Sequence, residues 1–315
     1  MMPMKLAFIG CGAMGAPIVE RLIAADHNVR IYDPDPSATA PLVQCGALAA
    51  KSPRDAATGS RIAFACLPSP EVSRSVALGP DGVSGCSELE IYIEMSTIGS
   101  RTIKDIAAGL HKSGIAVLDA PVSGGPRGAR AGTLATMVAG DRAAFERSKL
   151  LFETIARNVN YVGEAPGLGQ VTKLANNMIS AAGMAAAFEA SVMAVKAGVD
   201  ARVLIDTINV STGRNSATMD KFPASVLTRT FDYGGKLSTM YKDVFLCLEE
   251  ARELNVPMWV GANVVQIWFQ AMTQGRGNDD YTTLIKMIEE WSGVTVGGGE
   301  PGKISDPRKA SGTDV

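Results

Sequence analysis

Gly10-Cys11-Gly12-Ala13-Met14-Gly15 is the stretch that decides the fold of the first half of the chain. A short apolar run at 5–9 precedes it, a helical pattern follows at 16–25, and a second apolar run lies at 28–32. The spacing G-x-G-x-x-G between strand and helix gives a tight turn, lets the backbone approach a pyrophosphate and lets helix and strand pack closely. We therefore predict that a dinucleotide contacts Gly10, Gly12, Ala13, Met14 and Gly15. A glycine-rich turn without a ligand is the alternative.

Asp33 ends the second apolar run, 18 positions after Gly15. A carboxylate at this place accepts hydrogen bonds from the ribose hydroxyls of NAD and repels the 2′-phosphate of NADP. No arginine follows it directly, and Arg30 is expected on the face of the strand. The sequence therefore favours NAD over NADP.

Strands and helices continue to alternate up to about residue 166. Further apolar runs lie at 61–67, 91–94, 115–118, 133–139 and 158–162, and a helical pattern lies at 141–155. The pattern predicts an α/β fold in which residues 1–166 form a Rossmann-type, doubly wound parallel sheet of about seven strands.

Three loops follow strands of this sheet and are candidates for ligand contacts, because such loops line the crevice of an open parallel sheet. Leu67 and Pro68 form one, and Ser96 and Thr97 another. Ser96 or Thr97 could cap the next helix or touch the nicotinamide ribose, and capping alone is the safer interpretation for one of them. In the third, Ser123 precedes Gly124 and Gly125, whose exposed backbone N–H groups suit an anion such as a carboxylate. A plain glycine-rich loop remains open there.

The second half of the chain, residues 167–297, shows only helical patterns and is expected to be an all-α domain. Its first helix, 170–197, is apolar on nearly every face, which predicts burial and packing against another subunit. Lys173 and Asn177 are four positions apart in it, so they project from one face, where an amine and an amide can handle a hydroxyl proton and hold its oxygen. A substrate is expected between the two halves. Residues 298–315 form a polar tail that we expect to be disordered.

Composition excludes several classes of function. The formal net charge of −2 gives no basic field for nucleic acid. Five scattered cysteines and two histidines offer no metal-binding spacing, so we expect no metal and reduced thiols. The N-terminus lacks a signal-peptide pattern, and no apolar run approaches the roughly 18 residues of a membrane span. These features predict a cytoplasmic protein that acts on a small molecule.

The ordered motifs 10–17, 119–125, 169–177 and Lys242-Asp243 resemble those of the β-hydroxyacid dehydrogenases over residues 4–295. This family includes 3-hydroxyisobutyrate dehydrogenase, and its first domain is of the kind found in 6-phosphogluconate dehydrogenase. The resemblance implies a homodimer or homotetramer and makes Lys173 the catalytic acid/base. It assigns substrate binding to Ser123, Gly124, Gly125, Asn177 and Lys242, and places Lys242 and Asp243 near the cofactor.

The resulting hypothesis is hydride transfer between a β-hydroxy acid and NAD. Lys173 would take the hydroxyl proton in oxidation and return it in reduction, which requires it to be neutral part of the time; burial and the like charge of a nearby Lys242 would favour this. The substrate is a 3-hydroxyisobutyrate-like acid or, alternatively, that of a tartronate semialdehyde (2-hydroxy-3-oxopropionate) reductase or of a 2-(hydroxymethyl)glutarate or 4-hydroxybutyrate dehydrogenase.

Two other classes stay open. One is an NAD-binding interaction module without catalysis, and the other is an imine reductase, but Lys173 argues against both. Residues 212–221 and 231–236 are expected to shape the far end of the substrate pocket. Arg127, Arg214 or Lys236 could bind a second anionic group of the substrate, but any of them could equally be solvated.

Overall fold

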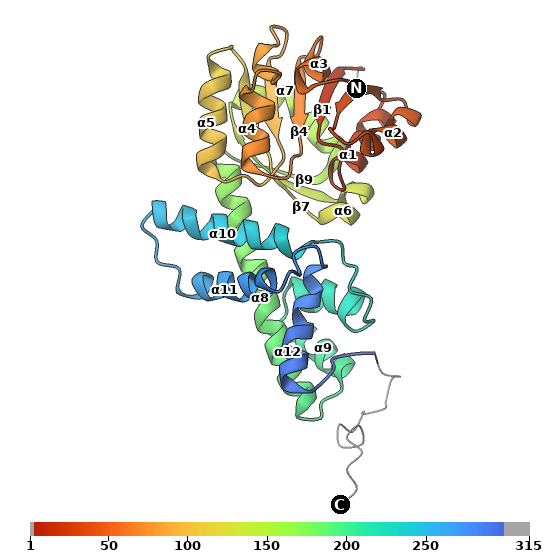
Figure 1. The fold of residues 1–315 in the computed structure, drawn as a ribbon, viewed down its shortest axis with the longest axis vertical. Coiled ribbons are helices and arrows are strands. Elements are labelled where there is room, and N and C mark those ends of the chain that lie inside the picture. Colours follow the sequence, from red (N-terminus) through yellow and green to blue (C-terminus); the bar gives the residue numbers. More distant parts are fainter. Residues whose placement is uncertain (1–2, 299–315) are drawn as a thin grey trace, which may run out of the picture. The chain divides into compact units, whose positions relative to one another are not determined.

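The computed structural model describes residues 3–298 and divides into two compact units after Leu174 (Figure 1). The first unit holds the whole sheet, and the second is helical. The boundary therefore falls inside a helix, several residues beyond the predicted domain boundary at 166/167. All but the first residue of the predicted tail, 298–315, lies outside the described residues.

The first unit contains one nine-stranded sheet. Its first six strands follow the order β3-β2-β1-β4-β5-β6, which is the order of a dinucleotide-binding fold. All neighbours in this part are parallel. The strands are β1 (Lys5–Ile9), β2 (Asn28–Tyr32), β3 (Leu48–Ala49), β4 (Ile62–Ala65), β5 (Ile91–Glu94), β6 (Ala116–Asp119), β7 (Val122–Ser123), β8 (Leu134–Gly140) and β9 (Ala156–Gly163).

Helices cover both faces of the sheet because successive strand residues point to opposite sides. Leu6 and Phe8 of β1 belong to one buried cluster, and Ala7 and Ile9 to the other. The helices are α1 (Gly15–Ala24), α2 (Pro36–Gln44), α3 (Pro53–Ala57), α4 (Pro70–Leu78), the 3₁₀ turn η1 (Val83–Gly85), α5 (Ser100–His111), α6 (Gly125–Ala131) and α7 (Arg142–Ile155). Figure 1 shows α4 and α5 side by side. The doubly wound α/β prediction is confirmed.

The far edge of the sheet departs from a purely parallel arrangement. β8 runs antiparallel to β6 and to the short β7, and β9 pairs in parallel with β8. The two-residue strands β3 and β7 are missing from the predicted set. A pair of residues is too short to show an alternating or continuous apolar pattern, so the sequence carried no signal for them.

The second unit is built from helices, as predicted from residue 167 onward. They are α8 (Leu168–Lys196), α9 (Ala201–Asn209), the π-helix η2 (Ala217–Val226), α10 (Leu237–Glu253), α11 (Trp259–Thr273), the 3₁₀ turn η3 (Tyr281–Thr283) and α12 (Leu284–Ser292). Phe188 packs on Phe222 with ring centroids 5.6 Å apart, which fixes η2 against α8. Arg229 and Glu289, with N and O 2.5 Å apart, join the end of η2 to α12.

Helix α8 is longer than any other helix in the described chain. Among the described residues it alone is long and apolar enough to cross a membrane by length and composition, a test that the core helix of a globular protein also passes. Phe188 and Met184 are fully buried, but Ile179 is 74% exposed and Met193 68% exposed. In a single chain, α8 is therefore not buried on nearly every face, contrary to the prediction from the sequence.

Candidate functional site

The glycine-rich loop has the shape that a bound pyrophosphate requires. A Cβ on Gly10 would lie 2.2 Å from the carbonyl oxygen of Cys66, and one on Gly15 would lie 1.9 Å from that of Gly10. A Cβ on Gly12, in contrast, would meet no atom within 4 Å. Gly10 and Gly15 are thus needed for the turn and its packing, whereas Gly12 leaves open space beside the backbone.

Helix α1 begins directly after this loop, with Ala13 and Met14 at its entrance. Met14 is the N-cap residue and no side chain caps the helix. The N-terminal N–H groups of a helix attract anions when no side chain satisfies them. The loop and the start of α1 therefore fit the phosphates of a dinucleotide.

Asp33 closes the same end of the sheet. Its carboxylate accepts from the backbone N–H of Cys11 (2.8 Å) and of Asp35 (2.9 Å). The glycine-rich loop and the end of β2 are thereby held together. The carboxylate lies where a ribose binds in this type of fold.

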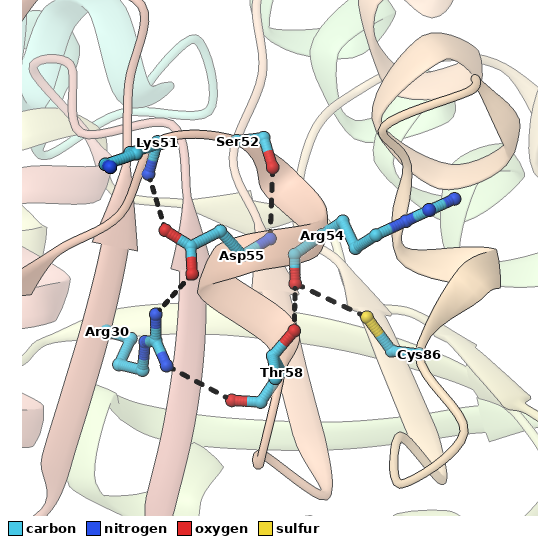
Figure 2. Close-up of polar contacts among 7 residues, drawn as sticks. All are labelled: Arg30, Lys51, Ser52, Arg54, Asp55, Thr58 and Cys86. Atoms are coloured by element: carbon cyan, nitrogen blue, oxygen red, sulfur yellow. Dashed lines mark hydrogen bonds and ion pairs between the residues drawn. The ribbon is translucent and has the colours of Figure 1, made fainter.

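Arg30 forms an ion pair with Asp55 on α3. Its guanidinium lies 2.6 Å from the carboxylate of Asp55 and also donates to the carbonyl of Thr58 (Figure 2). Asp55 in turn accepts from the backbone N–H of Lys51 at 2.8 Å. Arg30 therefore fastens β2 to α3.

The loops after β4 and β5 are tied to each other. The N–H of Leu67, next to Pro68, donates to Ser96 Oγ at 2.6 Å, and Ser96 Oγ donates to the buried carboxylate of Glu94. Glu94 also accepts from Tyr92 Oη at 2.9 Å, and burial raises the pKa of its carboxyl. The prediction that Ser96 or Thr97 caps the next helix is wrong: Gly99 is the N-cap of α5 and no side chain caps it.

Ser123, Gly124 and Gly125 form the turn between β7 and α6. Ser123 pairs with Ala135 of β8, and α6 begins at Gly125 without a side-chain cap. Gly124 and Gly125 have φ angles of +126° and +62°, which favour glycine. Their exposed backbone can approach an anion closely.

Two buried side chains hold the start of α8, the helix that carries Lys173. The carboxylate of Asp119, at the end of β6, accepts from the N–H of Gly167 (3.1 Å) and of Gln170 (2.9 Å). Burial raises the pKa of Asp119 to about 6, against the opposing effect of these N–H groups. The Gln170 side chain bonds the backbone of residues 96–99, which we call the Ser96 segment. Lys173, one turn further along α8, is 7% exposed.

In the second unit, Asn177 is joined to α10. Its Nδ2 donates to Asp243 Oδ2 at 2.6 Å, and its Oδ1 accepts from the amide of Asn176 at 3.0 Å. Asp243 also pairs with Lys242, whose Nζ lies 3.0 Å from Oδ1. Asp243 is 4% exposed, so this is a buried connection between α8 and α10 rather than a solvated pair on the surface of a helix.

A hollow of about 310 Å³ lies beside α8 within the second unit. Asn215 and Ser216 line it, and both belong to the range predicted to shape the substrate pocket; the other lining residues are Asn176, Ile179, Ser180 and Gly183. Ser216 Oγ accepts from the buried ammonium of Lys221 at 3.1 Å, and burial lowers the pKa of that lysine. Lys236, proposed for a second anion, instead donates to Asn278.

Sequence reasoning gave no individual role to Glu94, Asp119 or Gln170, although Asp119 and Gln170 lie within the motifs 119–125 and 169–177. Each is a fully buried polar residue at the end of a strand or the start of an apolar helix. That position was the available signal, since buried polar groups require partners. Among the described residues, no group of three side chains is arranged to hold a metal ion.

Two family descriptions together match most of the chain. Residues 5–163 match the NAD-binding domain of 6-phosphogluconate dehydrogenase, and residues 167–288 match the NAD-binding domain of NADP-dependent 3-hydroxyisobutyrate dehydrogenase. The gap between the two matched regions falls just before α8.

Curated relatives match over nearly their full lengths. The chain is 34% identical to 2-(hydroxymethyl)glutarate dehydrogenase of Eubacterium barkeri (94% of this chain, 98% of the relative). It is 34% identical to 3-hydroxyisobutyrate dehydrogenase of Pseudomonas aeruginosa (87% and 95%) and 33% identical to 2-hydroxy-3-oxopropionate reductase of Escherichia coli (91% and 97%). These relatives agree on the kind of reaction and differ in substrate.

Solved structures give the same result. The 3-hydroxyisobutyrate dehydrogenase of Mycobacterium tuberculosis, solved with L-serine, superposes with a TM-score of 0.83 at 30% identity, covering 91% of this chain and 99% of that one. Psf3, solved with NADP+ and 2-OPP, superposes with a TM-score of 0.81 at 26% identity, covering 90% and 99%. With the dinucleotide loop, the lysine-bearing helix and these matches in place, the chain belongs to the β-hydroxyacid dehydrogenase family of nicotinamide-dependent oxidoreductases.

Proposed function

We propose that the chain is an NAD-dependent, 3-hydroxyisobutyrate-like dehydrogenase that interconverts a β-hydroxy acid and its semialdehyde in the cytoplasm, with Lys173 as general acid/base. The observation that carries the proposal is the attachment of the first turn of α8. Asp119 and Gln170 tie this turn to the carboxyl ends of β5 and β6, where ligands bind in an open parallel sheet. The amine of Lys173 follows one turn later.

The nicotinamide ring supplies the hydride acceptor or donor when bound. Lys173 takes the hydroxyl proton of the acid in one direction and gives it back in the other. Ser123 and the backbone N–H groups of Gly124 and Gly125 hold the substrate carboxylate. Asn177, oriented by Asp243, binds the substrate oxygen, and Lys242 remains near substrate and cofactor as an ammonium paired with Asp243.

The choice of NAD over NADP rests on Asp33 and Arg30. The carboxylate of Asp33 offers acceptors to ribose hydroxyls, and its charge repels a 2′-phosphate. Arg30, the cation nearest to it in the sequence of β2, is engaged by Asp55 (Figure 2). Leu67, Pro68, Ser96 and Thr97 are proposed to contact the nicotinamide half.

Other β-hydroxy acids are the runner-up substrates. The relatives named above include a 2-(hydroxymethyl)glutarate dehydrogenase and a 2-hydroxy-3-oxopropionate reductase, and a 4-hydroxybutyrate dehydrogenase is a further alternative. Imine reductases share the fold at 19–22% identity, but Lys173 supports the hydroxy-acid reaction. Exposed apolar side chains on α8 support assembly into a homodimer or homotetramer.

The test is NADH formation from 3-hydroxyisobutyrate, glycerate, 4-hydroxybutyrate, 2-(hydroxymethyl)glutarate and threonate, each with NAD and with NADP. We expect turnover of at least one acid, with NAD preferred. Lys173→Ala should lose about 100-fold or more in kcat, because general acid/base catalysis contributes that much, while its affinity for NAD stays near that of the wild type.

Lys196→Ala is the matched control, since Lys196 lies at the other end of α8 and donates to the carbonyl of Ser292. Near-full activity of Lys173→Ala would refute the role of this lysine. Binding of NAD without turnover of any acid would favour the alternative of an NAD-binding interaction module.

A further inference from the structure

Gln170 has no exposed surface, yet its side chain bonds only to backbone groups of a distant loop. Its Oε1 accepts from the N–H of Ile98 (2.9 Å) and of Gly99 (3.2 Å). Its Nε2 donates to the carbonyl of Ser96 at 3.0 Å. Because Gln170 accepts two of these bonds and donates the third, they fix the position of the first turn of α8 along its axis and its rotation about that axis, relative to the Ser96 segment.

The Ser96 segment is fixed from its other side as well. Ser96 N donates to Glu94 at 3.0 Å, and Ser96 Oγ connects Glu94 to the N–H of Leu67. Asp119 holds the backbone of the same turn of α8 through the N–H of Gln170. A continuous set of hydrogen bonds, partly buried at Leu67 and buried from Ser96 onward, therefore runs from the loop after β4 to the turn that precedes Lys173.

Close packing also requires this arrangement. A Cβ on Gly169 would lie 2.4 Å from the carbonyl of Met137 and 2.7 Å from the carboxylate of Asp119. The turn of α8 thus sits directly against the sheet, and Gln170 is its polar contact with the Ser96 segment. Side chains three positions apart on a helix share a face, so any rotation at Gln170 displaces Lys173.

We propose that Gln170 is a positioning residue that holds Lys173 in register with the cofactor, and that cofactor binding at Leu67 and Ser96 is transmitted through it to the first turn of α8. The inference rests on the proposed role of Lys173 as proton donor and acceptor. Gln170 itself contacts neither substrate nor cofactor in this scheme. It acts by fixing where the amine lies.

The experiment compares the full-length wild type with Gln170→Met, which keeps the length of the side chain and removes all three bonds. We expect kcat per folded molecule to fall on the order of 10²-fold, as for a small misplacement of a catalytic group, while the Kd for NADH changes less. Tyr161→Phe is the control, because it removes a 2.8 Å hydrogen bond to the carbonyl of Gly140 elsewhere in the same unit. A purely structural role would lower thermal stability in both variants and leave kcat per folded molecule within twofold of wild type, which would overturn the proposal.

Gln170→Glu provides a second, independent readout if Gln170→Met folds poorly. Its carboxylate keeps the acceptor for Ile98 and Gly99 but places an oxygen against the carbonyl of Ser96. Protonation restores a donor, so the ratio of variant to wild-type kcat should rise as the pH falls through the raised pKa of the buried carboxyl. A ratio independent of pH would count against the proposal.

Amide hydrogen exchange separates this inference from the proposed activity. In the wild type, NADH should slow exchange in the peptide covering 168–176 by roughly threefold or more, and in Gln170→Met it should not. If no hydroxy acid is turned over, the proposed function is refuted, but the effect of NADH on amide exchange in residues 168–176 can still be measured. Equal slowing in both proteins, or none in the wild type, would overturn the role of Gln170.

Discussion

Asp119 is a single residue with a predicted effect on the pH dependence of stability. It is fully buried at the end of β6, and burial raises the pKa of its carboxyl to about 6. In an unfolded chain the same carboxyl titrates near 3.9. Because the unfolded state loses its proton first, the free energy of unfolding falls as the pH rises from about 4 to 6 and then stays level.

We expect this loss to be on the order of 3 kcal/mol, from a shift of about two pKa units. The asparagine in Asp119→Asn does not titrate. Between pH 4 and pH 7.5, the free energy of unfolding of the wild type should therefore fall further than that of the variant, and the difference should be about this loss. Urea unfolding at several pH values measures the difference, in which the other carboxyls cancel. Parallel pH profiles for the two proteins would show that Asp119 does not titrate as described.

Asp33 and Asp35 form a matched pair for testing cofactor choice. Both carboxylates accept backbone N–H groups, but Asp35 caps α2 whereas Asp33 faces the glycine-rich loop. Asp33→Asn removes the charge and keeps an acceptor, so the ratio of kcat/KM for NAD to that for NADP should fall by about tenfold or more, equivalent to roughly 1.4 kcal/mol of lost discrimination. Asp35→Asn should leave the ratio unchanged. An equal effect of both substitutions would contradict the assignment.

At the scale of elements, α7 is attached to the sheet by aromatic side chains. Phe152 is fully buried, with its ring centroid 6.5 Å from that of Phe64 on β4 and 6.2 Å from that of Phe145. Leu150, on the same helix, is 55% exposed. Substitutions at the two positions therefore distinguish the effect of buried packing on stability from the effect of helix propensity.

Phe152→Ala should lower the free energy of unfolding of the first unit by about 3–5 kcal/mol, because it removes a ring and leaves a cavity. Leu150→Ala should change it by less than about 0.5 kcal/mol. Urea unfolding followed by circular dichroism checks both, since the three tryptophans all lie in the second unit and their fluorescence reports on that unit instead. Similar losses in the two variants would mean that α7 is not anchored through Phe152.

At the scale of the whole molecule, the fold was predictable where adjacent residues carry a recognisable local pattern. The spacing of Gly10, Gly12 and Gly15 together with Asp33 predicts strand, turn, helix and strand from adjacent residues, and the structure confirms it. The antiparallel pairing of β8 with β6 was not predictable, because pairing direction depends on how the chain returns and not on local pattern.

For the proposed site, the sequence relates only residues that share one element. Lys173 and Asn177 share a helix, so their spacing alone relates them. Gln170, in contrast, bonds to the N–H of Ile98, 72 positions earlier in the chain. A contact of that range leaves no periodicity in the sequence, and only the fold brings the two groups together.

The assembly of chains is a prediction at the same scale. Met193 on α8 is 68% exposed, and large exposed apolar side chains mark surfaces where proteins associate. We expect light scattering to show a homodimer or homotetramer, and Met193→Glu to lower the mass toward that of one chain. Leu150→Glu, which exposes the same charge on the first unit, should retain the assembly. A wild type that runs as a single chain would refute the prediction.

The boundary between the two units falls within α8, between Lys173 and Asn177. One continuous helix therefore carries Lys173, the proposed proton donor, in the first unit and Asn177, proposed to bind the substrate, in the second. If substrate preference depends on residues beyond 174, those residues can change between relatives while the cofactor loop and Lys173 stay the same. The diversity of acids named among the relatives is the outcome that this modular inheritance would produce.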